Sequence, residues 1–350
     1  MAPRTVTRDD LAGAAQAAFA KSRLEAVSRL AGGTQKGVYR LTLDDGTTVI
    51  AYLWEESENF WPDWPGVGDR ADQFTSSDGA DLFEAAHGRL ASLGIRVPQI
   101  YLLDRDRTHY PADIAIIEDF PGEDLLALYE RDPIAAAPVL ARLREYLAAM
   151  RDYRAVSPGN VGHVDSGGKS YWPTCEEGAL DFALRCLAEA ARRDSRISGA
   201  RERLENRLRE MAAAIRPRAE YSVVHGELGL DHVMVDAEGD PVIIDIENLM
   251  YFDVEWEHAH MQIRLDDDDW AKTVGVEGLD EDRLAFYKLT QHLSLTAGPL
   301  RLLDSDFPDR AFMLDIADWN LNEALRFLEG SGNRQAPWRP GAAGPADRLG

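Results

Sequence analysis

Cysteine is scarce in this chain of 350 residues, which contains only Cys175 and Cys186. Two thiols spaced 11 residues apart on one face of an expected helix suit a reduced state in the cytosol, and they exclude a disulfide framework and a zinc ribbon. Apolar runs of membrane-spanning length are also lacking, and charges within residues 1–30 interrupt any signal-peptide core. We therefore predict a cytoplasmic protein that does not enter a membrane.

Positively charged residues are also scarce. The chain has 38 Lys and Arg residues but 61 Asp and Glu residues, which gives a formal net charge of −23. Binding to nucleic-acid phosphates needs clustered basic side chains, so this composition excludes a general nucleic-acid binder. The acidic surface instead favours a cationic partner, or keeps the protein in solution. Hydrophobic residues, at 45%, are numerous enough for sizeable cores, and the length fits one large domain or two ordinary ones.

The first third of the chain has the pattern of a small sheet. A helix is expected after Thr7, whose hydroxyl can cap it, and short alternating runs then predict strands. A stretch without a clean period predicts a long loop, and the helix after it is expected to end at Gly94. The expected strands are 24–30, 37–43, 47–54, 97–103 and 114–119, with the loop at 55–79 and the helix at 81–94.

Beyond Pro121 and Gly122 the helical period dominates, interrupted by one predicted hairpin with strands 221–225, 232–236 and 241–246. Helices are expected again from 253 to about 328. This order of elements predicts an α+β protein with a bilobal, protein-kinase-like fold, in which a small antiparallel-sheet lobe is joined to a larger, mainly helical lobe. We predict boundaries of 1–119 for the N-terminal lobe, 120–329 for the helical lobe and 330–350 for a flexible tail, with the ligand cleft between the lobes.

Polar residues gather around the predicted hairpin. A hairpin brings Glu227, which precedes the second strand, close to Asp245, which follows the third. One carboxylate can then take a proton from a hydroxyl while the other holds a hard divalent cation. A proton acceptor and a metal-binding carboxylate are the minimum set of groups for phosphoryl transfer. The full group is His225, Gly226, Glu227, Asp231, His232, Asp245 and Glu247.

The run VVHGELGLDHVMVDAEGDPVIIDIE resembles the aminoglycoside phosphotransferase family of antibiotic kinases, whose usual motifs are HGDxxxxN, a strand hairpin, and IDFE or IDxE. The resemblance implies transfer of the γ-phosphate of ATP or GTP to a hydroxyl of a small polar molecule, with Mg²⁺ as cofactor. By position, Glu227 matches the catalytic base, Asp245 the metal-binding Asp, and His232 the metal-binding Asn. Asp231 and Glu247, beside the site, are expected acceptor contacts.

The match departs from the family pattern at the base and at the metal. Glu227 is one methylene longer than the usual Asp, and a displacement near an ångström can cost on the order of a hundredfold in rate unless the backbone compensates. His232 offers an imidazole, which is a poorer ligand for magnesium than an amide oxygen. We expect His232 either to bind a metal such as manganese or to hold Glu227 in place.

The nucleotide side departs as well. Gly33 and Thr34 lie in a loop whose backbone N–H groups can approach phosphates, but the strand after it, 48–54, lacks the expected phosphate-binding lysine. Tyr52 is the nearest candidate on that strand, and Lys36 can reach from the loop as a substitute charge. The backbone at Glu118 and Phe120 is expected to meet a purine at the hinge. Glu84, the acid of the following helix, lies opposite that helix's apolar stripe.

Two other functions stay open from the sequence. The missing lysine, together with Glu227 and His232, fits a nucleotide-binding pseudokinase without transferase activity, and the carboxylates fit a metal-dependent hydrolase. A zinc site would use the acid and imidazole groups of His225, Glu227, His232, His258 and His260, although their spacing matches no standard zinc helix.

The acceptor is expected to be an antibiotic of aminoglycoside, cationic peptide or nucleoside type, which phosphorylation would inactivate. The run Asp266–Asp269 is either a solvated surface or an attraction for a polycationic acceptor. Aromatic residues of the long loop are expected to form either a lid over a bound ring or, as we favour, a small core beneath the loop: Trp54, Phe60, Trp61 and Trp64.

Overall fold

A five-stranded antiparallel sheet forms the N-terminal part of the chain. The structure is a computed structural model that describes residues 6–31, 33–62, 68–74, 78–265, 270–271, 274–275 and 277–329. The strands lie in the order β1-β2-β3-β5-β4, and β2 alternates buried and half-buried residues along its whole length, as the sequence pattern predicts. Their bounds are β1 Leu24–Arg29, β2 Gly37–Leu43, β3 Thr48–Trp54, β4 Ile100–Asp104 and β5 Asp113–Glu118.

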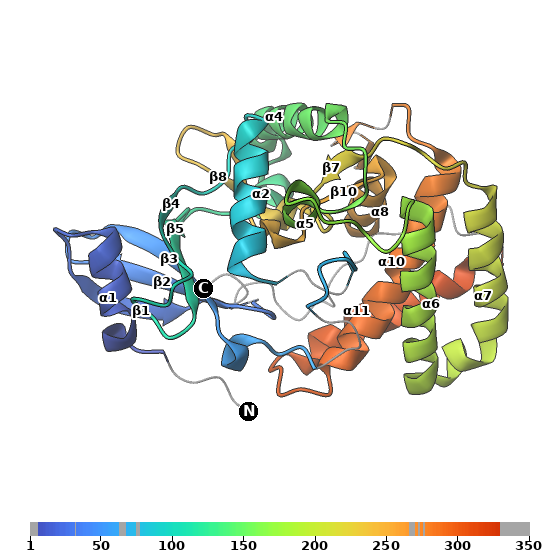
Figure 1. Cartoon of the computed structure of the whole chain (residues 1–350), viewed down its shortest axis with the longest axis horizontal. Helices are drawn as coiled ribbons and strands as arrows, with labels where there is room; N and C mark the ends of the chain where they lie inside the picture. Colours follow the sequence, from blue (N-terminus) through green and yellow to red (C-terminus); the bar gives the residue numbers. More distant parts are fainter. Residues whose placement is uncertain are drawn as a thin grey trace.

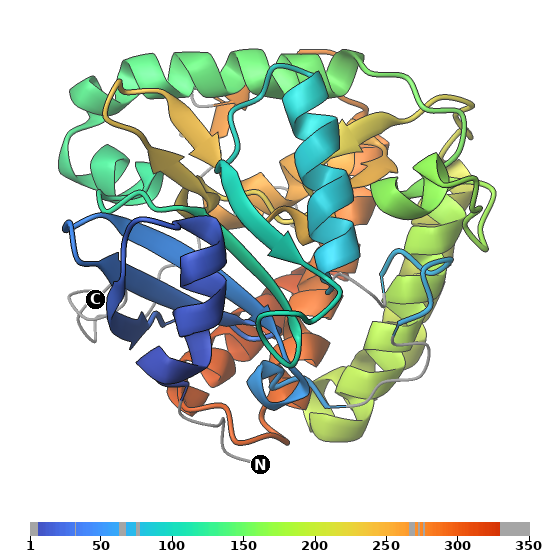
Figure 2. The ribbon, with the colours of Figure 1, turned by 60° about the vertical axis from the view of Figure 1, so that its left-hand side comes forward.

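Two helices cover the two faces of this sheet (Figures 1 and 2). Helix α1, Arg8–Ala18, begins at the expected cap, because Thr7 and Asp10 form a reciprocal capping box. Its Leu11 packs against one face in a core shared with Leu41 and Leu53. Helix α2, Ala80–Ser92, buries Phe83 and Leu90 against the other face. The sheet is thus covered on both faces.

Helices make up most of the chain beyond residue 119. In Figure 1, α4 and α5 lie beside α2 in the middle of the molecule, and α6 and α7 lie at the end away from the sheet, with α10 packed on both α6 and α11. The core that they enclose is continuous with the α2 face of the sheet, since Ile50 and Ile117 belong to the same cluster as Leu143 and Phe286. The division at residues 119 and 120 stays a prediction. The helices are α3 Leu125–Arg131, α4 Pro133–Asp152, α5 Val161–Asp165, α6 Cys175–Arg193, α7 Ser195–Ala214, α8 Val254–Arg264, α10 Glu281–Leu302 and α11 Arg310–Arg326.

Short strands inside the helical region carry the polar motif. Strands β8, Val233–Val235, and β9, Pro241–Ile243, form the expected hairpin. The expectation that residues 221–225 join this hairpin is wrong, because β7, Ser222–Val224, pairs with β10, Met250–Phe252, which in turn pairs with β6, Gly159–Asn160. Strands of two or three residues are too short to leave a period in the sequence.

No helix among the described residues is long and apolar enough to cross a membrane. Both cysteines lie buried in α6 as free thiols, as expected. Three expectations fall outside the described residues: the tail after residue 329, the acidic run Asp266–Asp269 and the role of Trp64.

Residues of the long loop after β3 form a small core, which confirms the favoured expectation for Phe60. Phe60 packs with Leu302, Phe307 and Met313, and its ring lies edge-on to Phe307 at 5.4 Å between centroids. Trp61 packs against the same cluster. The segment that follows β3 is therefore tied to helices α10 and α11, across the cleft from the sheet.

Removing this tie should destabilise the whole protein. Phe60→Ala is expected to lower the free energy of unfolding by about 3 to 5 kcal/mol, since it empties a buried aromatic site. Urea unfolding followed by circular dichroism measures the change. Leu314→Ala is the control, because Leu314 is 52% exposed on α11 and should cost less than about 0.5 kcal/mol. Equal losses in the two variants would contradict the packing described for Phe60.

Candidate functional site

The loop between β7 and β8, residues 225–232, is held in place by one buried carboxylate. Glu257 of α8 is 2% exposed and accepts the backbone N–H groups of His225, Gly226 and Leu228. Trp256 adds a hydrogen bond from its indole N–H to the Gly226 carbonyl, at 3.1 Å. Gly226 has φ +95°, and a side chain there would collide with Asn248, so only glycine fits this turn. The β7–β8 loop is thus a rigid platform for the residues that it carries.

His225 lies beneath this platform with no exposed surface. Its Nε2–H donates to the Ile244 carbonyl at 2.9 Å, because a carbonyl can only accept, and Nδ1 then carries no proton. Nδ1 has no hydrogen-bond partner among the described residues. Burial, helped by the neighbouring His232, lowers the pKa of His225 to about 4. His225 therefore joins the β7–β8 loop to the end of β9 as a neutral ring.

His232 links the expected base to the expected metal ligand. Its Nδ1–H donates to the backbone carbonyl of Glu227 at 2.9 Å, which leaves Nε2 facing Oδ2 of Asp245 at 3.8 Å. The same carbonyl argument places a proton on Nδ1; although burial opposes it, the charges of Asp231 and Asp245 raise the pKa of His232, so a metal ion at Nε2 would have to displace a proton. His232 thus both holds the Glu227 backbone and offers a donor atom beside Asp245, so both expectations for this residue stay open.

The Glu227 carboxylate reaches into the cleft. Its Oε1 accepts from the Nδ2 amide of Asn248 at 3.3 Å. Although the side chain stays accessible to solvent, the protein encloses it on its other sides, and this desolvation, with the negative charge of Asp245, raises its pKa. A carboxyl group with a raised pKa takes up a proton more readily, as a general base requires.

Asp245 lies at the junction between the hairpin and the cleft. Its backbone is left-handed, with φ 59° and ψ 48°, a conformation that costs free energy for any residue other than glycine and is concentrated at functional sites. Lys36 is the main cause that lowers the pKa of Asp245, so the carboxylate is ionised. Its two oxygens have different neighbours, since Oδ1 faces Lys36 and Oδ2 faces His232.

Lys36 reaches the site from the loop between β1 and β2. Its ammonium nitrogen lies 2.7 Å from Asp245 Oδ1 and 2.6 Å from Glu247 Oε1, and it sits 4.7 Å from the centre of the Tyr52 ring. Burial alone would lower the pKa of this lysine, but the two carboxylates outweigh it and raise the pKa. Lys36 and Tyr52, both expected on the nucleotide side, are thus brought together with Asp245 and Glu247.

Gly33 and Thr34 of the β1–β2 loop are tightly held. A side chain on Gly33 would lie 2.5 Å from the Lys36 carbonyl, so glycine allows the chain to fold back on itself here. Thr34 accepts a hydrogen bond from the Trp61 indole N–H at 3.0 Å through its hydroxyl, and one from the Phe60 N–H at 2.9 Å through its carbonyl. The loop that carries Lys36 is therefore fastened to the same segment that packs on α10 and α11.

The acidic side chains of the predicted hinge form ion pairs with arginines of the same chain. Glu118 accepts from Arg96 with both oxygens, at 2.7 and 2.8 Å, and Asp119 pairs with Arg40 at 2.8 Å. Phe120 is 9% exposed, with the Arg96 guanidinium 5.5 Å from its ring centre. The side chains of Glu118 and Asp119 are thus committed to arginines, and contact of the hinge backbone with a purine stays a prediction.

Asp231 and Glu84 lie apart from the cluster around Lys36. Asp231 forms an ion pair with Arg264, and although burial opposes its ionisation, Arg264 lowers its pKa to about 2. Glu84 pairs with Arg105 on the exposed face of α2, at 2.9 Å, as the position opposite the apolar stripe predicts. Among the residues that the structure describes, no group of three or more His, Cys, Asp and Glu side chains is arranged to hold a metal ion.

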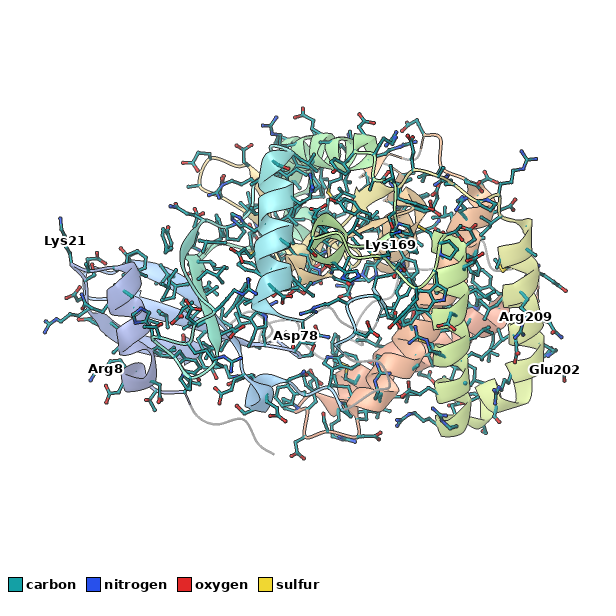
Figure 3. The ribbon with its side chains drawn as sticks, in the orientation of Figure 1. Arg8, Lys21, Asp78, Lys169, Glu202 and Arg209 are labelled. Carbon is teal, nitrogen blue, oxygen red and sulfur yellow. The ribbon has the colours of Figure 1, made fainter. Side chains whose placement is uncertain are left out.

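A small cavity marks the centre of the site, and three of its residues were not found from the sequence. It encloses about 30 Å³, room for a water molecule or an ion. Asp78 belongs to it, and Figure 3 shows Asp78 near the end of α2, in the middle of the molecule. Asn248 sits three positions after Asp245, and Gln35 lies in the predicted nucleotide loop between Thr34 and Lys36, whereas Asp78 has no motif signal. The lining residues are Gln35, Lys36, Asp78, Glu227, Asp245, Glu247 and Asn248.

Comparisons with known proteins concern the family and the fold of the chain. A model of the phosphotransferase enzyme family matches residues 26–288. Among solved structures, a thermostable mutant of aminoglycoside phosphotransferase APH(4)-Ia matches with a TM-score of 0.59 and 16% identity, over 89% of this chain and 96% of that one. No protein matches in the comparison with curated proteins.

Two kinases of other substrates have similar folds. The choline kinase LicA from Streptococcus pneumoniae matches with a TM-score of 0.57 and 13% identity, over 88% of this chain and 94% of that one. A putative fructosamine-3-kinase from Thermobifida fusca matches with a TM-score of 0.52 and 18% identity, over 90% of this chain and 98% of that one. These likenesses confirm the α+β, protein-kinase-like fold.

The buried state of His225 predicts how stability depends on pH. A histidine whose pKa falls from its ordinary 6.5 to about 4 on folding stabilises the protein above pH 6.5, and this contribution is lost as the pH falls toward 4. Between pH 6 and 4.5, the free energy of unfolding of His225→Gln should therefore change by about 1 kcal/mol less per pH unit than that of the wild type. Urea titrations at several pH values measure both slopes.

The control for this slope is His109→Gln, because His109 is exposed to solvent. It should leave the wild-type slope unchanged. A slope in His225→Gln that equals the wild-type slope would show that His225 takes up its proton equally well in the folded and unfolded protein.

Proposed function

The chain belongs to the phosphotransferase enzyme family, and we propose that it transfers the γ-phosphate of ATP or GTP to a hydroxyl of an antibiotic or a similar small polar molecule, which is thereby inactivated. The observation that carries this proposal is the convergence of Glu227, Asp245, His232 and Lys36 on one small cleft. These residues come from separate segments of the chain, and each has the chemistry that one part of phosphoryl transfer requires.

Glu227 acts as the general base in this proposal. Its carboxylate takes the proton of the acceptor hydroxyl while the hydroxyl oxygen forms a bond to the γ-phosphorus, and the bond from that phosphorus to the β–γ bridging oxygen breaks, releasing the nucleoside diphosphate. The raised pKa of Glu227 suits this proton transfer. The Asn248 amide and the His232 ring, bonded to the Glu227 side chain and carbonyl respectively, keep the base in one position.

Asp245 and His232 are the residues that would hold a divalent cation. The carboxylate Oδ2 and the imidazole Nε2 lie 3.8 Å apart and face each other, and Mg²⁺ sites that also bind substrate phosphates commonly use only one or two protein ligands. The bound cation would neutralise charge that develops on the phosphates. The nitrogen donor fits manganese at least as well as magnesium, which is the cofactor that the family resemblance implies.

The nucleotide is expected to lie against the β1–β2 loop and the hinge. Gly33, Thr34, Lys36 and Tyr52 would contact its phosphates, and the backbone at Glu118 and Phe120 its base. Solved structures of APH(4)-Ia include ternary complexes with ADP or AMP-PNP and hygromycin B, which supports a nucleotide donor and a hydroxylated acceptor here. A donor of this kind is abundant in the cytoplasm, the location that the sequence predicts.

The charge of the cleft favours a cationic acceptor. Four carboxylates line the cavity, those of Asp78, Glu227, Asp245 and Glu247, against the single ammonium of Lys36. Such a cleft concentrates positively charged molecules. Aminoglycosides and cationic peptide antibiotics fit this charge better than nucleoside antibiotics do. Asp231, engaged with Arg264, and Glu247, engaged with Lys36, stay predicted acceptor contacts.

One observation favours the pseudokinase alternative, because β3 presents Tyr52 where the family resemblance implies a lysine. The two functions separate in one experiment. Purified protein is incubated with ATP or GTP, Mg²⁺ or Mn²⁺, and a panel of hydroxylated antibiotics, and mass spectrometry records the gain of one phosphate. Tight nucleotide binding with no modified acceptor in a broad panel would make the pseudokinase the better proposal.

Glu227→Gln tests the base directly. The amide keeps the shape of the side chain but cannot take up the proton, so the turnover number should fall roughly 10²- to 10⁴-fold. Nucleotide affinity, measured by calorimetry, should stay within about threefold of the wild type, because the base contacts the acceptor hydroxyl. Glu202→Gln, on the outer face of α7 far from the site, is the matched control (Figure 3). Wild-type turnover in Glu227→Gln would remove Glu227 from the reaction.

Asp245→Asn tests the metal site. Losing the anionic oxygen should weaken nucleotide binding more than about 10-fold in the presence of Mg²⁺ or Mn²⁺, but much less when EDTA removes the metal. Calorimetric titration under both conditions gives the two ratios. Asp240→Asn, in the exposed turn between β8 and β9, should change neither. Similar losses with and without metal would indicate that Asp245 acts only as a partner of Lys36.

A further inference from the structure

Glu247 has a partner that its predicted role as an acceptor contact does not explain. The residue is 4% exposed, and apart from the Lys36 ammonium no hydrogen-bond donor among the described residues serves its carboxylate oxygens. Its Oε1 lies 2.6 Å from the Lys36 ammonium. Burial raises the pKa of Glu247, and Lys36 is the first of the groups that oppose this. A buried carboxylate aimed at one ammonium group is a counter-ion for that group.

The lysine–glutamate pair that kinases use to bind phosphates is missing from its usual position in this protein. In kinases, a lysine on the third strand binds phosphates and is held by a glutamate of the following helix. Here β3 carries Tyr52 at the site, and Glu84 of α2 is 54% exposed and paired with Arg105. Tyr52 lies opposite Val38 in the register of β2 and β3, two residues from Lys36, and the Lys36 ammonium lies over its ring. Tyr52 thus presents the face of its ring to the ammonium group that reaches this position from Lys36.

We propose that Lys36 and Glu247 together replace the strand lysine and helix glutamate of a kinase, with Glu247 acting as the positioning residue that holds Lys36 ready for the nucleotide phosphates. This inference rests on the proposed function, because it needs a nucleotide in the cleft. A lysine ammonium has three N–H donors. Asp245 and Glu247 face two of them, and a phosphate oxygen that enters the cleft can take the third.

Replacing the usual pair by Lys36 and Glu247 changes which part of the protein holds the lysine. The usual pair lies within the sheet lobe, whereas Lys36 comes from the sheet and Glu247 from the segment after β9 in the helical region. The phosphate-binding charge is therefore assembled from both sides of the cleft. The hydrogen bonds from Phe60 and Trp61 to Thr34, two residues before Lys36, hold this part of the β1–β2 loop in place.

Calorimetry with AMP-PNP and with the corresponding GTP analogue, in Mg²⁺ and without any acceptor, tests the proposal. Lys36→Met and Glu247→Gln should each raise the dissociation constant about 10- to 100-fold, as expected for loss of a contact with a charged group. Glu247→Gln added to Lys36→Met should raise it less than about twofold further, since the two residues act as a unit. Glu247→Asp, which keeps the charge, should recover part of the affinity.

Matched controls separate this role from general effects. Glu84→Gln removes the acid of α2 that would serve an ordinary kinase, and Lys21→Met removes an exposed lysine at the outer end of the sheet (Figure 3). Both should bind the analogues as the wild type does. Thermal unfolding of each variant shows that it is folded at the temperature of the titration. If Glu247→Gln is not folded, Tyr52→Lys in the Lys36→Met background, which keeps Glu247, provides the second test.

That rescue places an ammonium on β3 again, close to where Lys36 now holds it. Tyr52→Lys with Lys36→Met should regain at least about 10-fold in affinity over Lys36→Met alone, because the lost charge is restored. The regained affinity should still depend on Glu247, since the new ammonium would lie beside the same buried carboxylate.

Several outcomes would overturn the proposal. A tighter complex in Lys36→Met would show that the ammonium blocks the site instead of binding phosphates. An unchanged dissociation constant in Glu247→Gln, with a raised acceptor KM, would return Glu247 to acceptor binding. Wild-type protein that binds the analogues but phosphorylates no acceptor in a broad panel would count against the transferase function alone, because the affinities of the Lys36 and Glu247 variants for the analogues would still test the pair. Wild-type protein that binds neither analogue would refute both.

Discussion

Repulsion between carboxylates is the constraint around which this site is built. Asp245, Glu247 and Glu227 converge on a small cleft, and bringing like charges together in a partly desolvated space costs free energy unless a cation offsets it. Lys36 is that cation, and its ammonium contacts two of the three. Because Lys36 comes from the sheet and the carboxylates from the helical region, the same ion pairs that balance the charge also join the two sides of the cleft.

Hydrogen bonds to buried groups then fix the geometry around these charges. Glu257 gathers three backbone N–H groups of the β7–β8 loop, and His225 bonds this loop to Ile244 at the end of β9. Such buried polar networks give up much of their stabilisation when one member is removed, so they hold a single arrangement. This framework positions the expected base and the expected metal ligands, whereas Lys36 is held from the β1–β2 loop, where Thr34 accepts hydrogen bonds from Phe60 and Trp61.

The two departures from the family motif fit together in the folded protein. Glu227 is longer than the usual aspartate, and His232 stands where an asparagine is expected, yet the His232 ring reaches back to the Glu227 carbonyl while its other nitrogen faces Asp245. The imidazole is long enough to make both contacts at once. The longer base and the histidine are therefore parts of one local arrangement, which supports an active site adapted to these residues.

Much of this protein could be predicted from its sequence, because local patterns carry the information. The capping box at Thr7, the alternation in β2 and the hairpin of β8 and β9 each depend on neighbouring residues, and the spacing from Glu227 to Asp245 follows from the hairpin. The motif also placed Lys36 among the candidates to replace the missing lysine.

Only the tertiary structure decided which distant residues meet. The pairing of β7 with β10 and β6 involves strands too short to show a period, and nothing around Asp78 marks it as part of the cleft. Glu247 is predicted as an acceptor contact because it stands two residues after Asp245, the expected metal ligand, whereas its burial and its 2.6 Å contact with Lys36 depend on a loop more than two hundred residues away. Sequence fixes local conformation through short-range sterics and hydrogen bonding, but the partner of a buried charge is chosen by the whole fold, since it depends on which segments exclude water together.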